Sequence, residues 1–250
     1  MLAVLRDKLK PTRGFSHFGH LVLVALLPIL AYILVRIDFV SLAIGLILLS
    51  KWRIFAVRPR YWMANIIANG VDIIVGIAFV LFISSTASQW WQLGWTALYT
   101  SWLIWLKPKS DVLSVSAQAM IGQLLGLAVL YLKFGDASLP GLVAGTWLIA
   151  YLSARHFLTS FEEPQAPLLA HCWAYFAAGL AFVLGHWLLF YGTIAQIILL
   201  LTVIGYGIVA LYYLDAAQRL TDSIRRYMLG IMFVILVIVL VLSDWTGRTV

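Results

Sequence analysis

One acidic side chain, Asp72, lies well inside a long apolar stretch of this 250-residue chain. Asn65, Asn69, Asp72 and Gly76 follow one another at spacings of four, three and four, which places them within a narrow arc of one helix face. A carboxylate inside a bilayer costs about 2.5–3.5 kcal/mol on the insertion scale. This polar face predicts either a proton or cation site on a polar path from the cytoplasm or a ladder of hydrogen bonds between helices.

The position of Asp72 within its apolar stretch predicts its surroundings. It comes about eleven residues after the start of that stretch, which corresponds to roughly 16 Å of helix. This distance places the carboxylate near mid-membrane, and no lysine or arginine lies at that depth in the sequence. We therefore expect Asp72 to be protonated, hydrogen-bonded inside the bundle, or in contact with water or a cation.

Two further polar residues are candidates for the same path. Gln118 lies one helical turn before Gly122, and its amide is expected to hydrogen-bond across a helix interface. His171 begins a second polar stripe that continues through Tyr175 and Gly179. It shares a vestibule with Asn65 if the two helices are neighbours, and the alternative is a histidine satisfied at a helix interface.

Another candidate site lies in the loop between residues 155 and 167. Arg155, His156, Glu162 and Glu163 combine basic, imidazole and carboxylate groups within nine residues. Such a set could bind a metal, a phosphate head group or a partner protein, or transfer protons. The alternative is a solvated turn, because the segment ends in two prolines.

The elements that must position these residues are membrane helices. The chain is 63% apolar and only 11% charged, whereas charged residues make up about a quarter of a soluble domain. We expect an all-α polytopic helix bundle that forms one transmembrane domain over residues 1–250. This domain begins with a basic cytoplasmic segment at 1–18. The predicted spans lie near 19–35, 39–52, 61–83, 89–106, 112–132, 139–154, 167–189, 193–214 and 227–243.

Lysines and arginines predict the orientation, because short cytoplasmic loops collect them. With the N-terminus inside and the C-terminus outside, three basic residues face outward: Arg36, Lys133 and Arg248. Fourteen face the cytoplasm: Arg6, Lys8, Lys10, Arg13, Lys51, Arg53, Arg58, Arg60, Lys107, Lys109, Arg155, Arg219, Arg225 and Arg226. The short second segment could instead be re-entrant, but that topology would leave eleven basic residues outside and six inside.

The spacing of small residues and of charged residues predicts how helices pack and how far they extend. Gly122 with Gly126, and Gly141 with Gly145, are four apart and allow close approach of helices, within this chain or with other membrane proteins or a second copy of it. The alternating charges at 215, 219, 222 and 226 predict that the eighth span continues as a wet helix.

Composition and motifs exclude several functions. The basic residues lie in separate loops, so nucleic-acid binding is not expected. No predicted span contains the lysine that a retinal protein needs or the two aspartates of an intramembrane aspartyl protease, and the sequence has no HExxH zinc-binding pair. We expect neither a metal nor a cofactor. We expect a non-enzymatic multi-pass protein of a plasma or bacterial inner membrane that transports a small solute or ion at Asp72. The alternatives are a scaffold subunit of a membrane complex and an enzyme acting on a lipid-linked substrate at the cytoplasmic rim.

Overall fold

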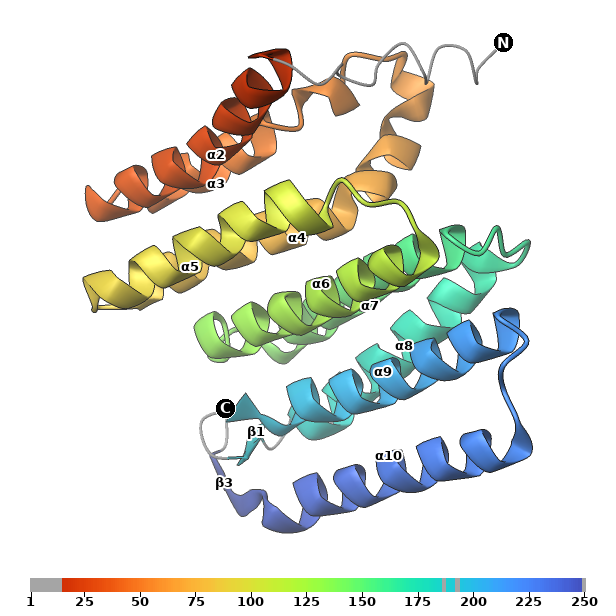
Figure 1. Cartoon of the computed structure of the whole chain (residues 1–250). Coiled ribbons are helices and arrows are strands. Elements are labelled where there is room, and N and C mark those ends of the chain that lie inside the picture. Colours follow the sequence, from red (N-terminus) through yellow and green to blue (C-terminus); the bar gives the residue numbers. More distant parts are fainter. Residues whose placement is uncertain (1–14, 186–187, 192–193, 249–250) are drawn as a thin grey trace.

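The computed structural model describes residues 15–185, 188–191 and 194–248 (Figure 1). Within these residues the chain forms nine α-helices, each at the place of one predicted span. The first fourteen residues of the predicted basic segment lie outside the described part. The helices are α2 (Phe15–Arg36), α3 (Val40–Leu49), α4 (Trp62–Ser85), α5 (Gln89–Ser101), α6 (Val112–Lys133), α7 (Leu139–Thr159), α8 (Ala166–Gly185), α9 (Gln196–Ala216) and α10 (Asp222–Leu242).

Length and hydropathy make five of the described helices suitable for crossing a bilayer. They comprise residues Pro59–Ser85, which include α4, and the helices α6, α8, α9 and α10. Apolar stretches at Val24–Arg36 and Val40–Leu49 are shorter. A helix satisfies its own backbone hydrogen bonds, which is the condition for entering the hydrocarbon region. The fold is therefore the helical bundle expected of a membrane-embedded protein.

The helices form two rows (Figure 1). One row contains α2, α5, α6, α9 and α10, and the other contains α3, α4, α7 and α8. The chain passes between the rows in antiparallel pairs, so α4 lies centrally and packs against α2, α3, α5, α6 and α7. At the far end, α10 packs against α9, and Val239 is its one buried residue.

The two halves of the bundle pack differently. Large apolar side chains of α2 to α5, including Ile47, Val75 and Ile83, form one core. In the other half, α8 presents a ladder of buried small residues to the bundle: Ala166, Ala170, Ala174, Ala177, Ala178, Ala181 and Gly185. Small side chains allow close approach of helices without any apolar driving force from lipid, and α7 and α8 consequently pack along their length.

Three short strands correct the predicted ends of two spans. The seventh span was expected to continue to residue 189, but α8 ends at Gly185. Strand β1 (Leu188–Tyr191) instead pairs antiparallel with both β2 (Ile194–Ala195) and β3 (Asp244–Arg248). The expected eighth span began at 193, whereas α9 begins at Gln196. Pairing with β3 satisfies the backbone of this apolar segment, so it does not need to be helical.

Connections after α2, α7 and α9 share one backbone motif. Asp38, Glu162 and Gln218 adopt left-handed backbones with φ of 60°, 54° and 54°. The next N–H in each case bonds to the carbonyl five residues earlier, as Arg219 N does to Leu214 O at 2.8 Å. This is a Schellman ending, in which glycine is usual at the left-handed position. The expected helical continuation through residues 215–226 is therefore wrong, because the chain reverses at Gln218.

Candidate functional site: an ion-paired cluster at Asp72

Asp72 is the centre of a cluster of charged and polar side chains from three segments. The Lys51 Nζ atom lies 2.6 Å from Asp72 Oδ2, and the Lys107 Nζ atom lies 2.9 Å from the same oxygen. Trp102 donates its indole N–H to Asp72 Oδ1 at 3.3 Å. The side chains of Lys51 and Asp72 are 11% and 16% exposed, and that of Lys107 is 37% exposed.

The expectation of a carboxylate without a basic partner is therefore wrong. Asp72 lies ten residues into α4, but Lys51 follows the end of α3 and Lys107 follows the end of the α5 segment. These neighbouring helices end at the level of Asp72, while α4 extends further. Distance along one helix does not measure distance from the nearest charged loop, because the ends of adjacent helices need not be level.

A π-helical turn places two of the partners. Residues Trp102–Leu106 at the end of α5 form a π-helix, η3, in which Lys107 N bonds to Trp102 O at 2.9 Å. In an α-helix, residues five apart differ by about 140° around the axis, so Trp102 and Lys107 would point in different directions. The wider π turn brings them onto one face, where both contact Asp72. Such turns occur frequently at functional sites.

Gln118 and His156 support the turn that carries Lys107. Gln118 Nε2 donates to Leu106 O at 2.7 Å and to Lys109 O at 3.0 Å. His156 Nε2 lies 2.9 Å from Gln118 Oε1. Because an amide oxygen only accepts, His156 carries a proton on Nε2. Gln118 therefore bonds across a helix interface, and through His156 it links α7 to the same turn.

The polar face of α4 lies against protein. Asn65 Nδ2 approaches Ile54 O at 3.5 Å, and Asn69 Nδ2 donates to Asn65 O at 2.9 Å. Gly76 is buried, and a Cβ atom at this position would lie 2.6 Å from Ile47 Cγ2 of α3. Asn65 and Asn69 thus bond to main-chain oxygens, and neither bond joins α4 to another α-helix, because Asn65 O belongs to α4 and Ile54 to a short 3-10 turn. The expected ladder of hydrogen bonds between helices stays a prediction for these two residues. Their role on a solute path stays a prediction.

His171 lies elsewhere. Its ring packs against Tyr151 at 4.7 Å and Trp147 at 5.7 Å between centroids, with Tyr175 at 6.2 Å. This aromatic cluster joins α7 to α8, and α8 lies on the far side of α7 from α4 (Figure 1). The structure therefore does not bring His171 together with Asn65 in a common vestibule.

The expected loop at 155–167 is shorter than predicted, because α7 continues to Thr159 and carries Arg155 and His156. The four rim residues make separate contacts. Glu163 accepts a hydrogen bond from the Tyr212 hydroxyl, and His156 bonds to Gln118. Glu162 occupies the left-handed Schellman position and is exposed, and the Arg155 Nε atom is buried without a partner among the described residues. Within the described part of the chain, no three His, Cys, Asp or Glu side chains are grouped to hold a metal.

The predicted glycine pairs pack inside the chain. A Cβ atom at Gly122 would lie 2.7 Å from Val71 Cγ1, and one at Gly126 would lie 2.7 Å from Ile74 Cγ2, so this face holds α6 against α4. Gly145 lies against Leu130, and Gly141 faces the Ser138 hydroxyl. Association with other membrane proteins or with a second copy stays a prediction.

The cluster has an excess of positive charge: two ammonium groups share one carboxylate. Sequence reasoning identified Asp72 and Gln118 but not Lys51, Lys107 or Trp102. The usable signal was that each lysine is the first charge after an apolar run adjacent to α4. The chain matches no protein-family model, no curated protein and no solved structure closely enough to establish a relationship.

Proposed function

We propose that this protein moves a small anionic solute or ion across the membrane and binds it at the cluster of Lys51, Asp72 and Lys107. In this proposal the chain crosses the bilayer nine times, with its N-terminus in the cytoplasm and its C-terminus outside. The observation that supports the proposal is the excess ammonium group of the cluster. The orientation rests on the distribution of lysines and arginines between alternate loops.

The cluster holds one ammonium group more than its carboxylate can neutralise. Charges within a membrane protein are generally paired or functional. Here one carboxylate faces two lysines, so a structural ion pair would be complete without one of them. An anion that binds Lys107, the most exposed member at 37%, supplies the missing negative charge.

Asp72 then acts as an internal competitor for the lysines. Without solute, its Oδ2 atom accepts from both ammonium groups. With solute, Lys107 turns from Asp72 to the anion, while Lys51, which is only 11% exposed, keeps the carboxylate in place. The cluster thus has two states, one with Lys107 on Asp72 and one with Lys107 on the solute. Binding of the solute shifts the equilibrium toward the second state.

Anion flux into proteoliposomes tests the proposal. The purified chain is reconstituted, and electrogenic currents are recorded on stepping chloride, inorganic phosphate or acetate. Wild type is expected to carry current with at least one anion, and Lys107→Gln is expected to abolish it. Lys109→Gln is the matched control, since Lys109 is exposed two residues away and forms no ion pair with another described residue. Equal loss in both lysine variants would contradict a specific role for Lys107.

A scaffold subunit is the second candidate, and the three partners of Asp72 favour it. In that case the cluster only holds α3, α4 and η3 together. Wild type would then carry no anion current, and Asp72→Asn would lower the unfolding temperature in detergent. An enzyme at the rim has less support, because Glu163 and His156 are hydrogen-bonded to different helices.

A further inference from the structure

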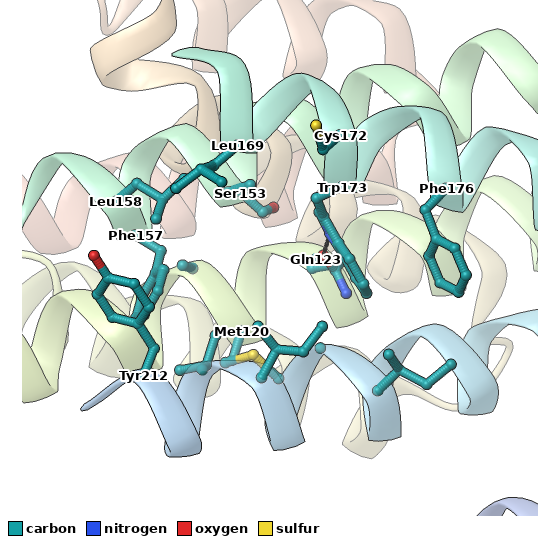
Figure 2. A pocket seen from close by; sticks show the side chains of 16 residues that line it. Met120, Gln123, Ser153, Phe157, Leu158, Leu169, Cys172, Trp173, Phe176 and Tyr212 are labelled. Carbon is teal, nitrogen blue, oxygen red and sulfur yellow. Dashed lines mark hydrogen bonds between the residues drawn. The ribbon is translucent and has the colours of Figure 1, made fainter. Parts of the chain in front are cut away.

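A largely apolar cavity of about 530 Å³ lies between α6, α7, α8 and α9 (Figure 2). Its walls include Met120, Phe157, Leu158, Trp173 and Phe176, and Figure 2 shows these side chains lining it. The volume falls within the range of about 300–1,000 Å³ that is usual for small-molecule sites. None of the residues that form the Asp72 cluster lines it, so this is a second site on different helices.

The cavity opens at the outer surface of the bundle. Leu169 and Phe176 of α8 and Ile208 of α9 line it and are 38%, 48% and 47% exposed. In a membrane this opening faces lipid. The lining extends along α9 from Ile204 to Tyr212, which corresponds to about 12 Å of helix, so the cavity is elongated parallel to the helices.

One wall of the cavity is fixed by hydrogen bonds. Gln123 accepts from Trp173 Nε1 at 2.8 Å and donates its own amide to Leu201 O at 3.2 Å. These bonds use the polar atoms of Gln123 and hold the indole of Trp173 as a flat apolar surface. At the end of the cavity nearest the C-termini of α7 and α9, the Tyr212 hydroxyl donates a hydrogen bond to Glu163, and the Tyr212 ring packs edge-on against Phe157. Neither Gln123 nor Trp173 therefore needs a polar group from a ligand.

Ser153 is different. It lines the cavity, is 2% exposed, and its hydroxyl has no hydrogen-bond partner among the described residues. A helical serine usually bonds back to the carbonyl four residues earlier, as Ser116 does to Val112 O at 2.7 Å. A buried hydroxyl without a partner has lost its hydrogen bonds to water and has formed no hydrogen bond within the protein in their place. The Ser153 hydroxyl is thus buried in the wall of the cavity and lacks an acceptor among the described residues.

We infer that the cavity binds one acyl chain of a membrane phospholipid, and that Ser153 donates a hydrogen bond to the ester carbonyl of that chain. The elongated apolar cavity suits a single acyl chain, and its opening faces the lipid bilayer, which contains the phospholipids. Ser153 lies six residues, about 9 Å, before the end of α7. Arg155, two residues after Ser153, is the first charged residue along α7. Ser153 therefore lies close to the boundary between the head groups and the hydrocarbon, where the ester groups of phospholipids lie.

Comparing an ester-linked with an ether-linked phospholipid distinguishes the contribution of the hydrogen bond from that of apolar binding, because the ether lacks the carbonyl oxygen. The full chain in detergent is titrated with diacyl or dialkyl phosphatidylglycerol of equal chain length, and bound lipid is counted by native mass spectrometry. Wild type is expected to bind the diacyl lipid about five-fold more tightly, which is the effect of one typical net hydrogen bond. Ser153→Ala is expected to bind both lipids equally, at the level of the dialkyl lipid. An unchanged ester preference in Ser153→Ala would overturn the assignment of Ser153.

A cavity-filling variant tests the site itself. Ile208→Trp is expected to remove the tightly bound lipid of either linkage. Its matched control is Val234→Trp on α10, a position that is 55% exposed and does not line the cavity. Equal lipid binding in both tryptophan variants would overturn the cavity as the binding site. Recovery of a free fatty acid instead of a phospholipid from purified wild type would overturn the choice of ligand.

Discussion

The imidazole of His156 on α7 and the side-chain amide of Gln118 on α6 are joined by a hydrogen bond of 2.9 Å. Gln118 uses its other amide atom for two main-chain oxygens at the end of the π-helix. One buried side chain thus joins α6, α7 and the turn that carries Lys107. The geometry of the Asp72 cluster therefore depends on a residue that does not contact Asp72.

Gln118→Leu is expected to lower the free energy of unfolding by about 1–3 kcal/mol, because two carbonyl oxygens and the His156 N–H lose their partner. Unfolding in mixed micelles with increasing denaturing detergent measures the change. Gln89→Leu at the exposed start of α5 is the matched control and is expected to be nearly neutral. A Gln118 effect no larger than that of Gln89 would refute the supporting role.

Gly122→Ala is expected to destabilise the chain by about 1–3 kcal/mol, since the new methyl group would lie 2.7 Å from Val71. The same unfolding assay in Val71→Ala supplies the second arm of a double-mutant cycle. The double variant should be more stable than the sum of the single effects predicts, because the smaller side chain makes room. Gly179→Ala is the control, with nothing within 4 Å of its Cβ position. Simple additivity would argue against close packing of α6 on α4.

Gln218→Gly is expected to stabilise the chain by about 1 kcal/mol. Gln218 has a φ of 54°, which is strained for a residue with a Cβ atom and relaxed for glycine. Ala217→Gly, one residue earlier with a φ of −79°, should lower stability or leave it unchanged. Thermal unfolding in detergent distinguishes the two, and a loss of stability in both would contradict the Schellman ending of α9.

Labelling of single cysteines tests the nine crossings. Cys172, the one cysteine of the chain, is first replaced by serine, and cysteines are introduced at Asp38, Ala87 and Ser110, all exposed between helices. An impermeant maleimide should label positions 38 and 87 from outside the cell and position 110 only after permeabilisation. If α3 is re-entrant, position 38 stays outside while 87 and 110 exchange sides.

Helix positions could be predicted closely from hydropathy. The segment expected at 112–132 is α6 at Val112–Lys133, and the one expected at 89–106 comprises α5 and η3. Apolar length and flanking charge are local properties, so the sequence records them directly. The strand after Gly185 was not predicted, because β2 contributes only two residues to the pairing and the longer partner, β3, is more than fifty residues away in the chain.

The partners of Asp72 could not be predicted for a related reason. A polar face on α4 indicates that Asp72 needs partners, but not which helix ends lie at its level. The contact of Lys107 also requires a π turn, which has no reliable sequence signal. Lys51 and Lys107 read as topology signals in loops, and only the packing of α3 and η3 on α4 turns them toward the carboxylate.

The two-row arrangement bears on how the protein is made. Every helix after α2 packs on at least one helix that precedes it in the chain, so each can dock as it leaves the ribosome and the insertion machinery. Domains generally assemble from the N-terminal side during synthesis, and this connectivity never requires an early helix to wait for a distant partner. Since α10 adds a single buried residue, the buried clusters formed by the earlier elements are complete before the last helix is released.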